Sequence, residues 1–248
     1  MKFVVAPSAA ERDRQAARWI TESVRPGRYL ALAVGASQQG AYRELAQCPG
    51  SLAGARGISL DELHPLPAGD PRSFGSQLAQ WLGAGAGAGT GIELDRWDPS
   101  APDPQAEADA VEARVRSAGL AACVLGLGPN GHIAFNEPGT PLDAPSRVTE
   151  LDPRTVAHLG GPGAIAPATR GITMGIPLLL SAARVLLLVV GENKADAFRA
   201  LVLGPLSDDA PATAVRLHPD VTVLCTRAEA AALPPEILGL LQEDPGVG

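Results

Sequence analysis

The sequence predicts an α/β protein in which helices cover both faces of a central, mostly parallel sheet. Short apolar runs alternate along the chain with longer amphipathic segments, which is the pattern of repeated strand and helix units. The run at residues 184–190 is apolar almost throughout, as is typical of a strand buried on both faces. Hydrophobic residues make up 46% of the chain and aromatic residues only 4%, so we expect an aliphatic core.

This alternation assigns each element along the 248 residues. The apolar runs predict strands at residues 2–5, 29–34, 57–60, 121–127, 184–190 and 221–225. The amphipathic segments that follow them predict helices at residues 9–24, 40–46, 73–82, 104–118, 194–203 and 229–241. The Gly/Ala-rich stretch at residues 83–91 has low complexity and is expected to be a surface connection. The strands on either side of it read as parts of one sheet, so we expect a single domain over residues 1–248.

Parallel strands joined by right-handed crossovers bind their ligands outside the carboxyl ends of the strands. We therefore expect the chemistry of this protein in the loops after Val34, Leu60, Leu127 and Val190.

Charge and cysteine usage narrow the class of partner. The net charge is −7 and basic residues do not gather at one end, which argues against nucleic acid and favours a small-molecule ligand. Cys48, Cys123 and Cys225 are far apart and lack metal-ligand spacing, as expected for reduced thiols. The amino terminus becomes charged too early for a signal peptide, and no apolar run approaches the ~20 residues of a membrane span. We expect a cytoplasmic protein with no metal site and no membrane contact.

The most informative stretch is residues 126–139, GLGPNGHIAFNEPG, which follows a predicted buried strand. Its glycines allow the backbone to approach a ligand closely. A histidine with a carboxylate nearby, here His132 and Glu137, can hold one imidazole tautomer and transfer a proton near neutral pH. A lone histidine is more often a core residue, but the crowding of polar residues at the end of a strand favours a functional site.

Three other places in the sequence carry candidate catalytic or binding residues. Asp61 and Glu62 follow the strand at 57–60 and provide either a catalytic carboxylate or an acidic pair that caps a turn. Lys194 and Lys2 are the only lysines among the twenty basic residues, so Lys194 is either a chosen anion ligand or a solvated residue at a helix start. His64 is a solvated loop residue or a substrate contact.

These strings resemble the glucosamine-6-phosphate deaminase family. The loop at 126–139 is similar to the family pattern G-x-[DN]-G-H-I-[AG]-F-N-E-P, whereas 6-phosphogluconolactonases share only its glycines and histidine. Residues 60–66 resemble L-D-E-Y-x-G-L, residues 191–197 resemble G-x-x-K-A-x-A, and residues 172–176 and 217–223 resemble I-T-M-G-I and L-H-x-D-V-T-V. The resemblance implies a NagB/RpiA-type Rossmann-like sandwich that converts a 2-amino-2-deoxy sugar 6-phosphate into a ketose phosphate and ammonia, without metal or organic cofactor.

The resemblance also implies a role for each matching residue. His132, assisted by Glu137, would open the sugar ring, and Asn130 stands where many members have an aspartate. Asp61 would move the proton from C2 to C1. The substrate-binding set would be Gly35, Ala36, Ser37, Glu62, Gly131 and Lys194.

The anion site departs from the family pattern. The family's T-G-[GS]-T loop is replaced by residues 34–37, in which Val34 removes the first hydroxyl. An arginine that binds phosphate in the family is missing from residues 156–162, so either the anion is bound differently, by Arg147, Arg170 or His158, or the substrate is not the usual phosphate ester. The substrate is therefore expected to be glucosamine 6-phosphate or a related amino sugar.

Two other functions remain open at this stage. A lactone hydrolase of the same fold would use His132 to activate water, but it would need an arginine near Asp61 that the sequence lacks. A non-catalytic sugar-phosphate sensor would need no base at position 61. The oligomeric state is also open, with a homo-oligomer as one option.

Overall fold

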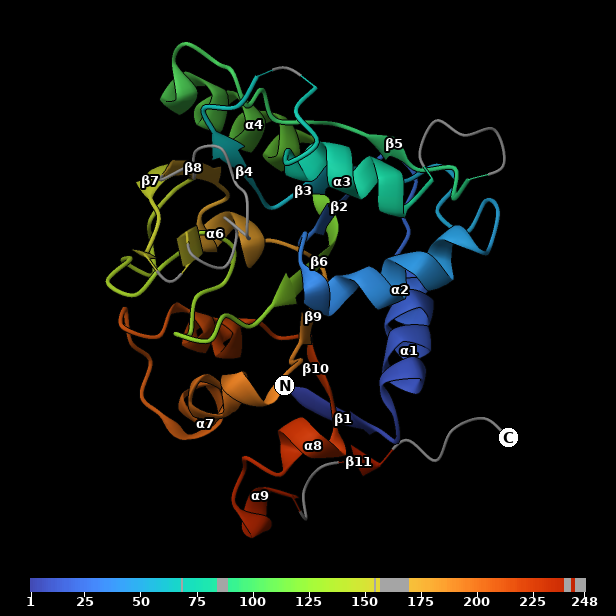
Figure 1. Cartoon of the computed structure of the whole chain (residues 1–248), viewed down its shortest axis with the longest axis vertical. Helices are drawn as coiled ribbons and strands as arrows, with labels where there is room; N and C mark the ends of the chain where they lie inside the picture. The colour runs from blue at the N-terminus through green and yellow to red at the C-terminus, as the bar shows by residue number, and fades with distance from the viewer. Residues whose placement is uncertain (68, 84–88, 154, 157–169, 239–241, 244–248) are drawn as a thin grey trace.

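Eight strands form one central sheet in the computed structural model, which describes all residues except 68, 84–88, 154, 157–169, 239–241 and 244–248 (Figure 1). The order across the sheet is β11 (Gln242–Glu243), β1 (Lys2–Ala6), β10 (Val221–Thr226), β9 (Val185–Leu188), β6 (Leu120–Gly126), β2 (Tyr29–Leu32), β3 (Arg56–Ser59) and β5 (Glu93–Leu94). Each pairing between neighbouring strands of this sheet is parallel. The predicted fold class is confirmed.

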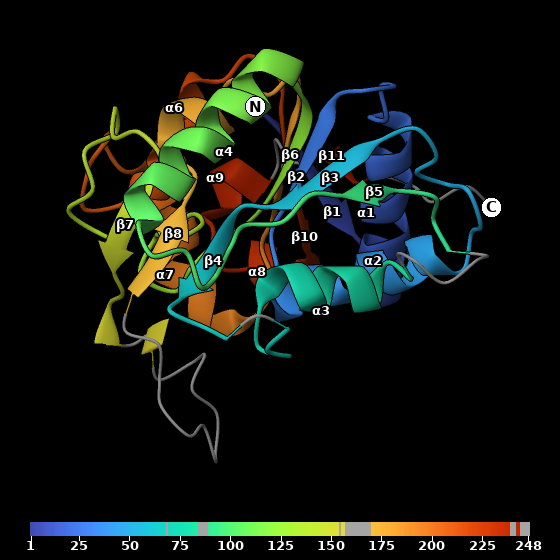
Figure 2. The same ribbon diagram turned by 90° about the horizontal axis from the view of Figure 1, so that it is seen from above.

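Helices cover both faces of this sheet (Figure 2). One face shares a hydrophobic cluster with α1 (Ala9–Glu22), α2 (Ala36–Ala46) and α3 (Phe74–Trp81), and the other with α4 (Pro104–Ala118), α6 (Ile176–Leu179) and α7 (Ala195–Leu203). Strand β2 serves both clusters, because side chains alternate along a strand: Leu30 and Leu32 enter the first cluster, and Tyr29 and Ala31 the second. This two-sided burial explains why the central strands read as continuous apolar runs.

A second, smaller sheet was not predicted from the sequence. Strands β4 (Asp61–His64), β8 (Arg170–Thr173) and β7 (Arg147–Glu150) pair antiparallel, in that order. Only Leu60 separates β3 from β4, so one stretch of chain leaves the large sheet and enters the small one. Each of these strands has four residues and at least one charge, so no apolar run marks them.

The structure differs from the predicted elements mainly at two helices. Helix α2 begins at Ala36 rather than near residue 40, because Gly35 has extended backbone and acts as its N-cap. The single helix predicted at 229–241 is wrong: α8 (Arg227–Ala230) and α9 (Pro235–Leu238) are separate, since the two prolines at 234 and 235 interrupt the helical hydrogen bonds. Residues 239–241 of that prediction lie outside the described residues. The described residues also form the 3-10 helices η1 (Glu192–Lys194) and η2 (Pro211–Leu217).

Within the described ranges, every helix is too short or too polar to cross a bilayer. Cys48, Cys123 and Cys225 are free thiols, and the last two are buried.

Candidate active site

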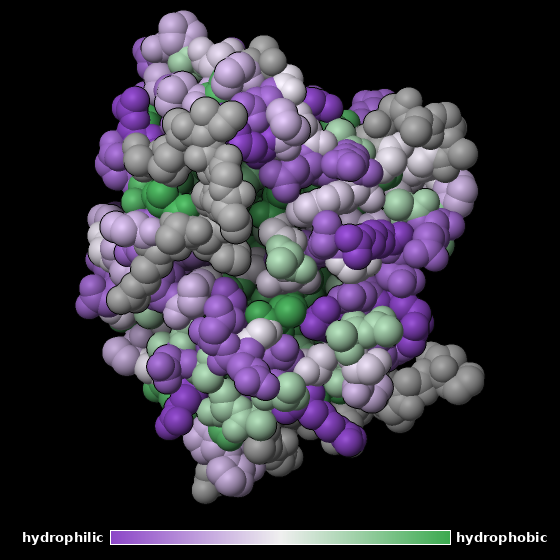
Figure 3. Space-filling model, viewed as in Figure 1, coloured by the Kyte–Doolittle hydropathy of each residue, from purple (hydrophilic) through white to green (hydrophobic). Residues whose placement is uncertain are grey.

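A cavity of ≈ 450 Å³ lies at the carboxyl ends of β2, β3, β6 and β9. It is lined by residues 33–38 after β2, Leu60 and Asp61 after β3, residues 126–130 from the end of β6, and Val190, Asn193 and Lys194 after β9. Figure 3 shows one face of the molecule, with apolar residues near its centre and hydrophilic residues closer to its outline. The four loops expected to carry the chemistry therefore line one cavity.

His132 lines this cavity with a carboxylate behind its ring. Its Nδ1 lies 3.1 Å from Oε2 of Glu137, which also accepts a hydrogen bond from Asn130 Nδ2 at 2.8 Å. Burial alone would raise the pKa of Glu137, but its hydrogen bond and charge interaction with His132, together with bonds from Thr155 and Asn130, hold that pKa below its usual value. An ionised Glu137 only accepts, so Nδ1 carries the proton and Nε2 is left to act on a ligand.

Asn130 holds this arrangement from a second side. Its Oδ1 accepts a hydrogen bond from the backbone N–H of His132 at 3.2 Å while its amide nitrogen donates to Glu137. The amide therefore links the loop backbone to the carboxylate, which an aspartate at this position would do only by placing two negative charges together.

The backbone of the loop makes room for the imidazole. A Cβ placed on Gly128 would lie 2.3 Å from His132 Cδ2, a distance that only the absence of a side chain allows. The Gly128 N–H also donates to the His132 carbonyl at 3.0 Å, which closes the loop around the ring. Gly131, with a φ of +88°, turns the chain between Asn130 and His132 but does not line the cavity, so it shapes the loop rather than forming a wall of the site.

Asp61 enters the cavity from the junction between the two sheets. It is the first residue of β4 and is only 6% exposed. Burial raises the pKa of Asp61 well above its usual value, and the negative charges of Glu62 and Glu137 raise it further. A carboxylate with a raised pKa is a stronger base, which suits removal of a proton from carbon.

Glu62 does not line the cavity. Alternation along β4 turns its side chain away from that of Asp61, and its carboxylate accepts hydrogen bonds from Ser73 Oγ at 2.7 Å and from the backbone N–H groups of Phe74 at 2.9 Å and Gly75 at 3.1 Å. These are donors at the start of α3, so Glu62 caps that helix. The predicted substrate contact is replaced by a structural one.

His64, two residues further on, is also structural. It is 6% exposed, and its Nε2 lies 3.1 Å from the carbonyl oxygen of Ala101. It is neither a solvated loop residue nor part of the cavity wall.

The predicted anion loop lies at the amino end of α2. Gly35, Ala36 and Ser37 line the cavity, and the N-cap Gly35 offers no side chain to the first N–H groups of the helix. Uncapped N–H groups and the positive end of the helix dipole attract anions. Sequence reasoning missed the neighbouring Gln38, which also lines the cavity although it is only 2% exposed.

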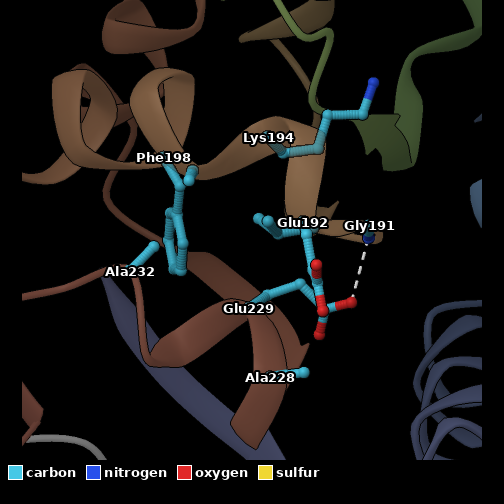
Figure 4. A pocket seen from close by; sticks show the side chains of 9 residues that line it. Gly191, Glu192, Lys194, Phe198, Ala228, Glu229 and Ala232 are labelled. Carbon is cyan, nitrogen blue, oxygen red and sulfur yellow. Dashed lines mark hydrogen bonds between the residues drawn. The ribbon is translucent and has the colours of Figure 1, made fainter.

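Lys194 lies at the wall between this cavity and a smaller one of ≈ 190 Å³ (Figure 4). Figure 4 shows its side chain pointing away from the carboxylates of Glu192 and Glu229, and Glu229 accepts a hydrogen bond from the Gly191 N–H at 2.9 Å instead. Burial lowers the pKa of Lys194. With no carboxylate paired to it among the described residues, the ammonium is available to an anionic ligand.

The alternative anion ligands are placed elsewhere. Arg147 donates to Asn136 Oδ1 at 2.8 Å and to Thr140 Oγ1 at 3.1 Å, and it does not line the cavity. Arg170 is the first residue of β8, the middle strand of the small sheet, where its Nε lies 3.9 Å from Glu150 Oε1, and it does not line the cavity. His158 lies outside the described residues. In the described part of the chain, no cluster of three or more His, Cys, Asp or Glu side chains is arranged to hold a metal ion.

Comparison with known proteins gives a consistent result. Residues 12–224 match the family described as glucosamine-6-phosphate isomerases/6-phosphogluconolactonase. The chain is 33% identical to a glucosamine-6-phosphate deaminase of Exiguobacterium sibiricum, over 95% of this chain and 94% of that protein. It is 34% identical to glucosamine-6-phosphate deaminase 1 of Bacillus subtilis, over 95% of this chain and all of the relative (100%).

Solved structures share the fold. A monomeric glucosamine-6-phosphate deaminase superposes with a TM-score of 0.85 at 32% identity, covering 94% of this chain and 100% of that one. The 6-phosphogluconolactonase of Trypanosoma cruzi superposes with a TM-score of 0.76 at 19% identity, covering 94% and 96%, which shows a common fold alone. From its sequence match and its structure, this chain belongs to the family of glucosamine-6-phosphate isomerases and 6-phosphogluconolactonases.

Proposed function

We propose that this protein is an enzyme that isomerises and deaminates glucosamine 6-phosphate, or a close amino-sugar relative, to a ketose phosphate and ammonia. The observation that carries the proposal is the placement of Asp61 and the His132–Glu137 pair around one cavity. A proton donor for the ring oxygen and a separate base for carbon are the two groups that an aldose–ketose isomerisation of a closed sugar requires.

In the proposed reaction, His132 Nε2 takes the proton of the C1 hydroxyl and delivers it to the ring oxygen as the bond between C1 and the ring oxygen breaks, giving the open-chain aldehyde. Glu137 acts as a positioning residue that keeps the proton on Nδ1. Asp61 then takes the proton from C2 and returns it to C1, which converts the amine carbon into an imine. Water adds to this imine and ammonia leaves, so that one water is consumed for each ammonia released.

The anionic end of the substrate is proposed to bind at the start of α2 and at Lys194. Uncapped helical N–H groups, Ser37 and an ammonium without an internal partner in the described structure are suited to a phosphate. This placement leaves the sugar carbons between the anion loop and the two proton-transfer groups.

Several observations favour this reaction over the alternatives. The Trypanosoma cruzi lactonase is 19% identical and shares only the fold, whereas the two deaminase relatives are 33% and 34% identical over a similar share of the chain. A sensor would gain nothing from Asp61, which is buried beside two other carboxylates at a cost in stability.

The proposed setting is the cytoplasm, with a small sugar phosphate as the partner and neither nucleic acid nor membrane. Free thiols and a phosphorylated substrate favour a reducing, intracellular compartment. The net charge of −7 disfavours binding to polyanions.

Ammonia release from glucosamine 6-phosphate, followed with Asp61→Asn and the exposed surface variant Asp109→Asn, tests the proposal. Asp61→Asn should lower turnover by about 100-fold or more because it removes the base, while glucosamine 6-phosphate still binds with near wild-type affinity in calorimetry. Asp109→Asn should keep wild-type turnover. Equal ammonia release by the wild type and Asp61→Asn, or none by the wild type over a panel of amino sugars and their 6-phosphates, would contradict it.

A further inference from the structure

Gln38 is a buried polar side chain without a partner, placed inside the cavity. It is the third residue of α2, is 2% exposed, and its Nε2 forms no hydrogen bond among the described residues. A buried amide that forms no hydrogen bond destabilises a protein, so such groups call for an explanation. The neighbouring Gln39 is of the same residue type but does not line the cavity.

The position of the amide is set by two glycines. Its Nε2 lies 2.7 Å from the point where a Cβ of Gly126 would be, and its Oε1 lies 3.4 Å from the corresponding point on Gly35. The Gln38 amide thus lies between the end of β6 and the start of α2, in space that a side chain on Gly126 would fill.

The surroundings of this amide select an oxyanion as its ligand. The first turn of α2 presents uncapped N–H groups on one side, and Lys194 lines the same cavity after β9, the strand beside β6 on the side away from β2. Val34 provides no hydroxyl to this loop, and Arg147 is bonded to Asn136 and Thr140. An N–H donor that lies among positively charged groups favours a hydrogen-bond acceptor that carries negative charge.

We propose that Gln38 is a substrate-binding residue: its amide, whose Nε2 is closed to solvent in the ligand-free protein, turns toward the cavity and donates an N–H to a phosphate oxygen of the substrate, in place of the hydroxyl lost at Val34. The identity of the ligand rests on the proposed function, whereas an oxyanion site at Gln38 does not depend on turnover. Because the amide is neutral, it selects phosphorylated over unphosphorylated sugars by a hydrogen bond rather than by charge.

Gln38→Met tests this inference, with Gln39→Met as the matched control in the same helix turn. Methionine keeps the length of the side chain and removes the donor. The dissociation constant of inorganic phosphate, measured by calorimetry, and the KM of glucosamine 6-phosphate should each rise about tenfold, with kcat nearly unchanged. The affinity for unphosphorylated glucosamine should stay at the wild-type value, and Gln39→Met should behave as the wild type throughout.

Thermal unfolding of Gln38→Met separates a binding role of Gln38 from a purely structural one. Removal of an unpaired buried amide should raise the unfolding midpoint of the ligand-free protein by about 2–4 °C, while the increase caused by phosphate becomes smaller. A lower ligand-free midpoint with unchanged phosphate affinity would make Gln38 structural and overturn the inference. If no amino-sugar phosphate is turned over but Gln38→Met still weakens phosphate binding, the proposed function fails and the oxyanion site stands.

Discussion

The two carboxylates of the cavity differ in what surrounds them. Glu137 accepts hydrogen bonds from Asn130 and Thr155 and contacts the His132 ring, which together keep its pKa low despite burial. Asp61 has no such donors in the described structure, and burial together with two like charges raises its pKa. One carboxylate is therefore stabilised as an anion beside a histidine, and the other has a raised affinity for a proton.

The raised pKa of Asp61 links its proton to stability. The folded state holds this proton more tightly than the unfolded state, so the stability that Asp61 contributes is fully present below the unfolded value near 3.8 and is lost as the pH rises through the folded pKa. Urea unfolding of the wild type and Asp61→Asn across this range should show a difference that grows with pH in favour of the variant. A difference that is constant with pH would contradict the raised pKa.

The site cannot accept a side chain at position 128, where the residue is Gly128. In Gly128→Ala the new Cβ must displace the His132 ring, and a shift of about 1 Å should lower kcat/KM about 100-fold. Gly139→Ala in the same loop is the control, because its Cβ meets nothing within 4 Å and the φ of +89° should cost only about 1–2 kcal/mol of stability. Ammonia release and urea unfolding, measured for both variants, separate the two effects.

At the scale of elements, Glu62 joins β4 to the start of α3. In the described structure its carboxylate only accepts hydrogen bonds. Glutamine at this position would therefore turn its NH₂ group, a donor, toward an N–H or O–H that is also a donor. Glu62→Gln should lower the free energy of unfolding by about 2–3 kcal/mol. Its KM for glucosamine 6-phosphate should stay close to that of the wild type in the folded fraction, and a large rise in KM with unchanged stability would instead restore Glu62 as a substrate ligand.

The elements that sequence could predict are those with a strong apolar pattern. Strands such as β6 and β9 are buried on both faces, and α4 was predicted with its observed bounds; in the structure Asp103 is its N-cap, Pro104 its first residue and Gly119 its C-cap. Strand β4 reads D-E-L-H, which resembles a polar loop, and its pairing with β8 is a long-range contact that no local pattern records. The small sheet was missed for that reason.

Across the whole molecule, the parts of the site that follow from the topology of the sheet could be predicted, and the parts that depend on long-range contacts could not. The loops at strand ends were predictable because a parallel sheet brings them to one edge. The role of Glu62 was not, since two adjacent acids look alike in sequence and only the alternation of β4 sends one into the cavity and the other to α3. Gln38 was missed because nothing in a sequence distinguishes a buried, unpaired amide from a solvated one.

Asp61 begins the small sheet, whereas His132 belongs to a loop that leaves the large one, so the two proton transfers proposed for them depend on different sheets. The two sheets meet at Thr173, whose Oγ1 accepts a hydrogen bond at 3.2 Å from the backbone N–H of Phe135 in the His132 loop. Thr173 in β8 also pairs with Asp61 in β4. Thr173→Val should enlarge the rate difference between ordinary and C2-deuterated substrate, and an unchanged isotope effect would show that proton removal from C2 does not depend on this contact.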